Sequence, residues 1–135
     1  MTKDKIERRL FSVFNHTLTP VQIQAATDLL GVTDIIEMPE RLKKVWQQIP
    51  AELETIKPII EPVQEWLKEC AGPFDFVLIQ GDFGATWLMV DFAFKHGLVP
   101  VYSTTRREAK ETVQADGSVK TEHIFQHQIF RRYGC

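Results

Sequence analysis

Phe74-Asp75-Phe76-Val77-Leu78-Ile79-Gln80-Gly81-Asp82-Phe83-Gly84 is the stretch that decides the fold of this 135-residue chain. Its residues 74–80 form an apolar, partly β-branched run, which is typical of a central strand covered on both faces. Residues 85–96 continue as a strongly apolar helical stretch that ends at Gly97, and residues 98–102 form a second apolar run. This order of strand, glycine loop, helix and strand predicts a βαβ unit with two parallel strands and a right-handed crossover.

The residues before this unit predict two more strands, each followed by helical sequence. Residues 10–14 are short and apolar, and residues 32–38 form a second such run. Between them, Thr19 and Pro20 are typical of a helix start, and Gly31 is typical of a helix end. Residues 39–50 and 51–70 carry apolar side chains at helical spacing, although Pro58 and Pro62 should kink the second stretch or split it.

The last third of the chain predicts an antiparallel hairpin. Residues 108–114 and 119–130 flank Ala115-Asp116-Gly117-Ser118, which contains an Asp-Gly turn between alternating segments. The sequence shows no repeat, low-complexity segment or linker, so we expect one domain over residues 1–135. The expected fold class is α/β, with a mainly parallel sheet and a C-terminal β-hairpin.

The composition is typical of a globular domain, and we expect the protein to be cytoplasmic. No apolar run approaches the roughly 20 residues of a membrane-spanning helix, and residues 1–5 lack the apolar stretch of a signal peptide. Residues 103–135 hold 6 basic and 4 acidic side chains, a net charge of +2, whereas residues 1–102 hold 10 and 14, a net charge of −4. The basic excess is too small for binding along duplex DNA, but it suits a small anionic ligand or a solvated face.

Three polar loops are candidate ligand sites, because ligands of open α/β sheets bind beyond the carboxyl ends of the strands. They are Asn15-His16-Thr17, Gln80-Gly81-Asp82-Phe83-Gly84 and Ser103-Thr104-Thr105-Arg106-Arg107. The second loop brings glycine backbone to a helix N-terminus, which favours an anion. It has neither the lysine of a Walker loop nor a dinucleotide fingerprint, which disfavours an ATPase or a nicotinamide enzyme. Asp82 either accepts a hydrogen bond from a ribose hydroxyl or caps the helix.

The third loop offers the donors that phosphate oxygens require. Thr104 and Thr105 supply hydroxyls and Arg106 supplies a guanidinium, whereas alternation along an emerging strand should point Arg107 away. The alternative for this loop is a solvated strand end.

No metal site is expected from the histidines. His123 and His127 are four residues apart on an expected strand, so they would stand roughly 13 Å apart and could not share one ion. His16 is the histidine that lies in a candidate ligand loop, where its alternative is a structural role.

The three loops together resemble a family of small CRISPR-associated ring nucleases. The motifs that carry the resemblance are Phe14-Asn15-His16-x-Leu18-Thr19, Ile79-Gln80-Gly81-Asp82-Phe83-Gly84 and Val101-Tyr102-Ser103-Thr104-Thr105-Arg106-Arg107. The likeness covers nearly the whole chain, and Ser103 departs mildly from the small residue, such as alanine, that is expected at its position. The resemblance implies a Rossmann-like three-layer fold, similar to CRISPR-associated Rossmann-fold sensor domains.

The resemblance also implies a function and a site. The function is metal-independent and cofactor-free cleavage of cyclic oligoadenylate, with the four-membered ring as the expected substrate, which switches off type III CRISPR antiviral signalling. The implied catalytic residues are His16, Thr104, Thr105 and Arg106. The implied ligand-binding residues are Asn15, Gln80, Gly81, Asp82, Phe83, Gly84, Ser103 and Arg107.

The implied reaction is physically reasonable for a small site. A ribose 2′-hydroxyl attacks its own adjacent phosphate once the ring is held in line, and effective molarities for such aligned steps reach roughly 10⁵ M or more. Arg106 and the threonine hydroxyls would stabilise charge on the phosphate, and His16 would assist proton transfer. A ring of identical nucleotides has rotational symmetry, so we expect a homodimer with the ring across its two-fold axis.

The alternative function is a binding module that senses cyclic oligoadenylate without cleaving it. We see no attached effector nuclease or DNA-binding domain, which leaves a sensor without an output and favours the enzyme.

Overall fold

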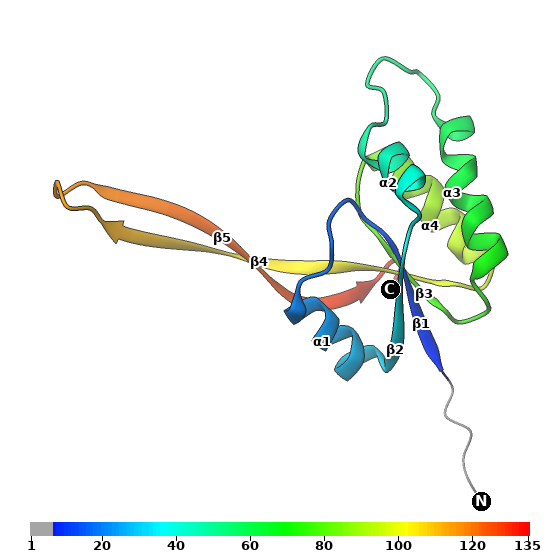
Figure 1. The fold of residues 1–135 in the computed structure, drawn as a ribbon, viewed down its shortest axis with the longest axis horizontal. Coiled ribbons are helices and arrows are strands. Elements are labelled where there is room, and N and C mark those ends of the chain that lie inside the picture. The colour runs from blue at the N-terminus through cyan, green and yellow to red at the C-terminus, as the bar shows by residue number, and fades with distance from the viewer. Residues whose placement is uncertain (1–6) are drawn as a thin grey trace, which may run out of the picture.

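A computed structural model describes residues 7–135, so the expectation about residues 1–5 lies outside the described residues. The described chain forms five strands and four helices (Figure 1). In chain order these are β1 Arg8–Val13, α1 Pro20–Leu30, β2 Val32–Glu37, α2 Glu40–Gln47, α3 Lys57–Cys70, β3 Phe76–Ile79, α4 Phe83–Lys95, β4 Val99–Val113 and β5 Val119–Arg132. The fold class is α/β, as the sequence predicts. No helix in this part of the chain is long and apolar enough to cross a membrane.

The five strands form one mixed sheet in the order β2-β1-β3-β4-β5. β1 pairs in parallel with both β2 and β3, and β3 pairs in parallel with β4. β5 runs antiparallel to β4. The prediction of a mainly parallel sheet with a C-terminal hairpin is therefore confirmed, as is the pairing of β3 with β4 in parallel across α4.

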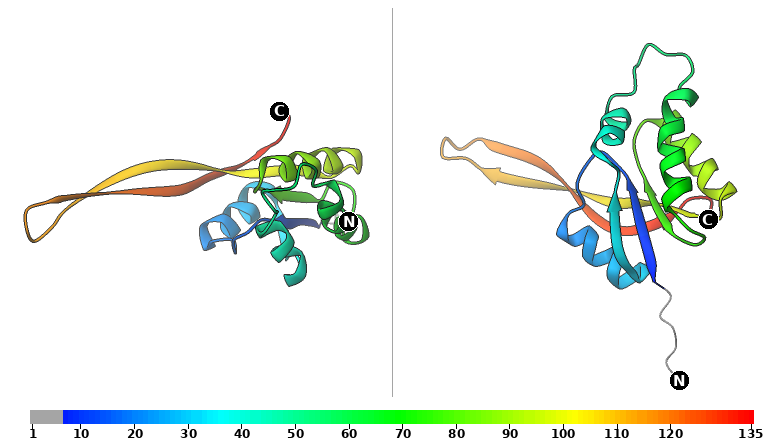
Figure 2. Two further views of the ribbon diagram at one scale, coloured as in Figure 1. Left: turned by 90° about the horizontal axis from the view of Figure 1, so that it is seen from above. Right: turned by 45° about the vertical axis from the view of Figure 1, so that its right-hand side comes forward.

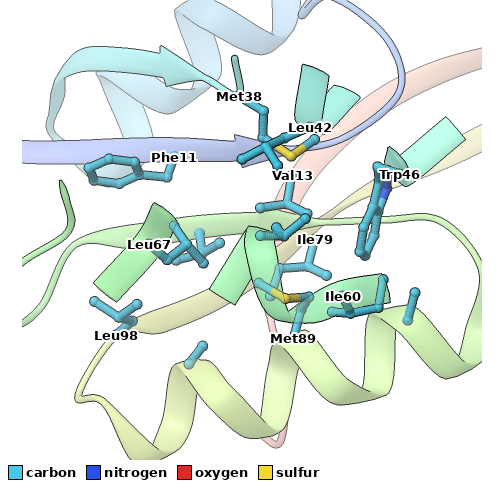
Figure 3. Packing of buried hydrophobic residues seen from close by; sticks show 14 residues of the cluster. Phe11, Val13, Met38, Leu42, Trp46, Ile60, Leu67, Ile79, Met89 and Leu98 are labelled. Carbon is cyan, nitrogen blue, oxygen red and sulfur yellow. The ribbon is translucent and has the colours of Figure 1, made fainter. Parts of the chain in front are cut away.

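Helices cover both faces of the parallel part of the sheet. Successive residues of a strand point to opposite faces, so Phe76 packs with the α1 cluster while Val77 packs with the α2, α3 and α4 cluster. The larger cluster fills the space between the sheet and α2, α3 and α4 (Figure 3). Burial on two faces is the reason that β3 has no polar residue between Phe76 and Ile79.

Local signals set the helix boundaries. Thr19 and Gln22 form a capping box at the start of α1, and Gly31 ends this helix with a left-handed φ of 67°. α3 is one helix from Lys57 to Cys70, so the predicted split at its prolines does not occur. Pro58 stands in the first turn, where a backbone N–H has no intrahelical acceptor. Pro62 lies inside the helix, where its missing N–H removes one hydrogen bond, the bond to the carbonyl of Pro58 in the first turn.

The hairpin of β4 and β5 reaches far beyond the rest of the sheet, and Figures 1 and 2 show it projecting from the body of the protein. β3 pairs with β4 only as far as Val101, whereas β5 stays paired with β4 to Val113. We call residues 105–127 the arm. The prediction that residues 103–107 form a loop is wrong, because β4 runs through them. Their backbone groups are paired with β5, which removes the need for the chain to turn after Tyr102.

Candidate functional site

The carboxyl ends of β1 and β3 lie side by side where the chain changes direction across the sheet. The chain leaves β1 for α1 on one face and leaves β3 for α4 on the other face. The backbone N–H of Gln80 donates to the carbonyl of Val13 (3.2 Å), so the loop after β3 starts beside the loop that carries Asn15 and His16. Two of the three predicted ligand segments therefore meet at the type of position where open α/β sheets bind ligands.

Trp46 of α2 supports the loop after β3 from the core. Its indole Nε1 donates to the carbonyl of Gln80 (2.9 Å), and its side chain is only 2% exposed. A Cβ on Gly81 would stand 2.6 Å from the same nitrogen, which is closer than atoms can approach. Gly81 is therefore required by the close contact of its backbone with the indole. This contact and the hydrogen bond from Trp46 to Gln80 fix the position of the loop relative to α2.

Replacing Gly81 with alanine should lower the free energy of unfolding by about 1–3 kcal/mol, because the new methyl group must displace a packed indole. Urea unfolding followed by circular dichroism measures this change. Gly72→Ala is the matched control, since a Cβ at Gly72 meets its nearest atoms at 3.7 and 3.8 Å, which are ordinary contacts. Equal stabilities for the two variants would contradict the close contact at Trp46.

Asp82, Phe83 and Gly84 form the start of α4. The Asp82 carboxylate accepts from the backbone N–H of Ala85 (3.0 Å), so the capping role that the sequence left open is present. Phe83 is 95% exposed, which leaves a large aromatic ring open beside the loop. Gly84 lies in the first helical turn. The negative charge of Asp82 therefore lies at the helix N-terminus, where it stabilises α4.

Ser103 of β4 joins the loop after β3 to the other face of the sheet. Its backbone N–H donates to the Gln80 side-chain oxygen (2.8 Å), and its hydroxyl oxygen accepts from the side-chain nitrogen of Gln22 in α1 (3.4 Å). The same hydroxyl is hydrogen-bonded with Nδ1 of His127 in β5. Ser103 is only 7% exposed. It therefore connects β3, β4, β5 and α1 through one side chain and one amide.

Thr104 occupies an irregularity in the pairing of β4 with β5. Its hydroxyl donates to the carbonyl of Ile129 (3.2 Å) and accepts from the N–H of the same residue (3.1 Å). The register shifts at this point, between the pairs Ser103 with Phe130 and Thr105 with His127. The hydroxyl thus replaces a missing backbone partner at a bulge, so both of its hydrogen-bonding functions are used within the fold.

The arm separates the two arginines onto opposite faces. Directly paired residues of an antiparallel ribbon share a face, so Thr105, His127 and Phe125 lie on one face with Arg107. Arg106 lies on the other face, because residues alternate along a strand. The guanidinium of Arg107 stands 6.0 Å from the centre of the Phe125 ring. The expectation that alternation points Arg107 away is therefore wrong, because Arg107 shares the face of Thr105.

Two pockets lie on either side of β4 at this edge of the sheet. The first has a volume of about 470 Å³ and lies on the side of α1; its lining residues are Thr19, Val21, Gln22, Thr105, Phe125, Gln126 and His127. The second has a volume of about 350 Å³ and lies on the side of α4; its lining residues are Gln80, Gly81, Phe83, Thr86, Tyr102 and Tyr133. Ser103 links the two pockets, because it is hydrogen-bonded with Gln80 of the second pocket and with Gln22 and His127 of the first.

Three buried polar side-chain atoms near this edge have no hydrogen-bond partner among the described residues. They are Oδ1 of Asn15, Oγ1 of Thr86 and Nε2 of His127. Asn15 follows β1 beside the Gln80 loop, Thr86 lines the second pocket with Gln80, and His127 bonds to Ser103, which bonds to Gln80. Buried polar groups in native proteins are almost always paired. Three exceptions near one loop make this edge a candidate site for a polar ligand.

Burial lowers the pKa of His127 below the ordinary value of histidine, because desolvation disfavours the charged imidazolium. The unfolded chain therefore binds this proton more readily than the folded chain. The stabilising contribution of neutral His127 is complete above the unfolded-state pKa and is lost as the pH falls through that value toward the folded-state pKa. At neutral pH the side chain is a neutral imidazole with one N–H donor and one acceptor.

Acidification from about pH 7.5 to about pH 5.5 should lower the melting temperature more in the wild type than in His127→Gln, which carries no titrating group. Thermal unfolding at several pH values measures the difference. His123→Gln is the control, because it removes an exposed histidine from the same strand by the same substitution. Parallel curves for the wild type and His127→Gln would show that His127 does not titrate in this window.

Four residues of this site were not predicted from the sequence, namely Gln22, Trp46, Thr86 and His127. A signal for His127 exists in the Asp-Gly turn, because counting equally outward from that turn places His127 opposite Thr105. The predicted hairpin began at residue 108, because residues 103–107 were expected to form a loop, so this pairing was not predicted. No comparable signal places Trp46 under Gly81, because they are 35 positions apart and belong to different elements. Among residues 7–135, no group of three or more His, Cys, Asp and Glu side chains is arranged to hold a metal ion.

Comparison with known proteins finds one family model and one curated relative that cover almost all of this chain. The model is described as the Uncharacterized protein MJ1673 family, and it matches residues 8–131. The relative is the Uncharacterized protein MJ1673 of Methanocaldococcus jannaschii, which is 43% identical over 125 residues that span 93% of this chain and 96% of that protein. No solved structure is significantly similar to the chain.

Proposed function

We propose that this chain, which belongs to the MJ1673 family, is a ring nuclease that binds cyclic oligoadenylate at the carboxyl edge of its sheet and cleaves it without a metal. The observation that carries the proposal is the set of unpartnered buried polar atoms on Asn15, Thr86 and His127 around the Gln80 loop. A ligand with many hydrogen-bonding groups along a closed ring would satisfy atoms that lie on several elements at once. Two of the three motifs that resemble ring nucleases meet at this edge, and the third is joined to it by the hydrogen bond from Ser103 to Gln80.

The topology supports the finer assignment of a Rossmann-like fold. The four parallel strands have the order β2-β1-β3-β4, with α1 on one face and α2, α3 and α4 on the other. The chain adds β2 on one side of β1 and β3 on the other side, so the strand order reverses between β1 and β3. In doubly wound folds with this order, nucleotides bind at the carboxyl ends of the two strands beside the reversal. Here those ends carry Asn15 and His16 on one side and Gln80 and Gly81 on the other.

The proposed reaction breaks one phosphodiester bond of the ring by an internal attack. The ribose 2′-oxygen forms a bond to the adjacent phosphorus, the bond from phosphorus to the 5′-oxygen breaks, and the proton of the 2′-hydroxyl is balanced by protonation of the leaving 5′-oxygen. The products are a 2′,3′-cyclic phosphate end and a 5′-hydroxyl end. The role of the protein is to hold the ring in line and to move this proton, for which His16 is the exposed imidazole at the edge.

The structure changes which residues of β4 we assign to contact with the phosphate. Thr104 already donates and accepts within the bulge, so its expected catalytic role rests on the ring displacing that pairing. Thr105 and Arg107 share the face of the first pocket, and we assign them to phosphate contact there. Arg106 lies on the opposite face of its own arm, so it would reach a phosphate only from another direction or from another protomer.

We further propose a homodimer with the ring across its two-fold axis. Phe83 and Trp87 are one helical turn apart on α4 and are 95% and 66% exposed, which makes a local aromatic patch beside the Gln80 loop. An isologous contact through this patch would place two copies of the edge next to each other. Light scattering that shows a monomer, both free and with ligand, would remove the dimer from the proposal.

The test of the function is incubation of the purified protein with labelled cyclic tri-, tetra- and hexa-adenylate in excess EDTA, followed by resolution of the products. The expected result is a linear product with a 2′,3′-cyclic phosphate, formed without added metal. Tight binding of an intact ring would select the sensor that cleaves nothing. If the protein neither binds nor cleaves any of the rings, the proposal is overturned. A linear oligoadenylate of the same length is the matched control for ring recognition.

A further inference from the structure

The pocket on the α1 side of β4 is lined mostly by residues other than those that the ring resemblance implies. Of its seven lining residues, the resemblance implies only Thr105. The pocket lies between the start of α1 and the foot of the arm, and its volume of about 470 Å³ is within the range of small-molecule sites. It therefore needs an explanation of its own.

The walls of this pocket suit a flat apolar surface. Phe125 is 65% exposed and Val21 is 63% exposed, although both line the pocket. The Arg107 guanidinium near the Phe125 ring adds a positive charge at the same place. Aromatic rings beside cationic side chains are the common platform on which nucleic acid bases stack, while the cation contacts a neighbouring phosphate.

The polar end of the pocket has one donor whose direction is determined by its neighbours. The Gln22 side-chain oxygen accepts from the N–H of Thr19 (2.9 Å), so its side-chain nitrogen is the group that donates to the Ser103 hydroxyl. The Ser103 hydroxyl keeps its own proton to donate, and Nδ1 of His127 lies within hydrogen-bond distance of it. In the tautomer in which Ser103 donates to Nδ1, neutral His127 carries its proton on Nε2, which has no partner among the described residues.

We propose that this pocket binds a purine base, which stacks on Phe125 and accepts a hydrogen bond from Nε2 of His127. A purine offers ring-nitrogen acceptors at the edge of a flat apolar surface, which matches one lone donor beside exposed apolar walls. Nε2 of His127 is a neutral donor, which suits a ring nitrogen of a base, whereas Arg107 beside Phe125 suits the phosphate attached to that base. The assignment of this base to an adenine of the cyclic oligoadenylate rests on the proposed function, whereas purine binding itself does not. Ser103 is then a positioning residue, because it acts on the base only through His127.

The experiment measures binding by calorimetry with two probes, 5′-AMP and a cyclic tetra-adenylate whose 2′-hydroxyls are replaced by fluorine to prevent cleavage. Phe125→Ala should weaken binding of both probes roughly ten-fold or more, in line with base stacking on an aromatic side chain. Ile124→Ala is the matched control, because Ile124 is the adjacent exposed apolar residue on the opposite face of the arm. Phe125→Trp should restore the affinity.

His127 provides a second, independent readout. His127→Leu should weaken both probes, whereas His127→Gln should retain more affinity because its amide nitrogen can occupy the place of Nε2. Nitrogen-15 NMR of the imidazole should show the proton on Nε2 in the free protein and a shift of that signal with either probe. Ser103→Ala should change the free-state tautomer signal, which a merely space-filling serine would not.

The outcomes separate this inference from the proposed function. Ring cleavage by the wild type, with Phe125→Ala equal to Ile124→Ala in affinity and an unmoved His127 signal, would overturn the purine pocket and leave the nuclease in place. Binding of 5′-AMP that depends on Phe125 and His127, without binding or cleavage of any ring, would support the purine pocket and overturn the nuclease. Absence of binding by both probes would overturn both.

Discussion

Trp46→Ala should lower the free energy of unfolding by about 3–5 kcal/mol, which is the usual cost of removing a large aromatic side chain from a core. Trp46 is 2% exposed and belongs to the cluster between the sheet and α2, α3 and α4 (Figure 3). The substitution also removes the donor to the Gln80 carbonyl. A loss of this size is a large part of the 5–15 kcal/mol that a typical domain has in total.

Urea unfolding of three variants separates the two roles of this side chain. Trp46→Phe keeps most of the buried surface and removes only the indole N–H, so it should cost less stability than Trp46→Ala while still loosening the Gln80 loop. Lys44→Ala is the control, because Lys44 is exposed on the same helix and should change stability by no more than about 0.5 kcal/mol. A loss below about 1 kcal/mol for Trp46→Ala would contradict its place in the core.

His16→Ala should reduce single-turnover cleavage of cyclic tetra-adenylate by roughly 10² to 10⁴-fold, the range for loss of a general acid or base. His16 is exposed in the loop after β1, where its ring makes an edge-to-face contact with Phe14 at 5.2 Å. Its removal therefore disturbs no buried contact, and the variant should fold as the wild type does. The measurement uses excess enzyme in EDTA, so that product release does not limit the rate.

The binding constant of the same variant decides what His16 does. Unchanged affinity for the fluorinated ring together with slow cleavage would assign proton transfer, whereas a parallel loss of affinity would assign a positioning role. His96→Ala is the control, because His96 is an exposed histidine at the end of α4 whose Nδ1 is hydrogen-bonded with the carbonyl of Phe92. Cleavage at the wild-type rate by His16→Ala would overturn its assignment.

Several features of the fold followed from local sequence. The apolar run of residues 74–80 contains the central strand β3, which covers Phe76–Ile79. The Asp116-Gly117 turn became the end of a hairpin, and Gly31 ended α1 in a left-handed conformation. Each depends on residues within a few positions of one another, because a turn, a cap or an alternating strand expresses its own backbone and side-chain preferences. The meeting of the loops after β1 and β3 also followed, once the order of elements predicted parallel strands.

The site depended on contacts between residues that are far apart in the sequence. Gly81 was expected as part of a loop whose glycine backbone favours an anion, yet the structure requires this glycine for the close contact with Trp46 of α2. Residues 103–107 were expected as a loop because their polar side chains follow an apolar run, but pairing with β5 kept them in a strand and moved Arg107, in place of Arg106, to the pocket side. Polarity alone cannot distinguish a loop from an exposed strand, since both present polar side chains to water.

The sequence by itself therefore determined the elements, the parallel core and the hairpin of this protein. Only the tertiary structure decided which side chains complete the site, because the pairing of β4 with β5 and the packing of α1 and α2 bring His127, Gln22 and Trp46 to the Gln80 loop from distant positions. Local preferences act over a few residues, whereas a site is made by side chains whose positions depend on the burial of the whole core.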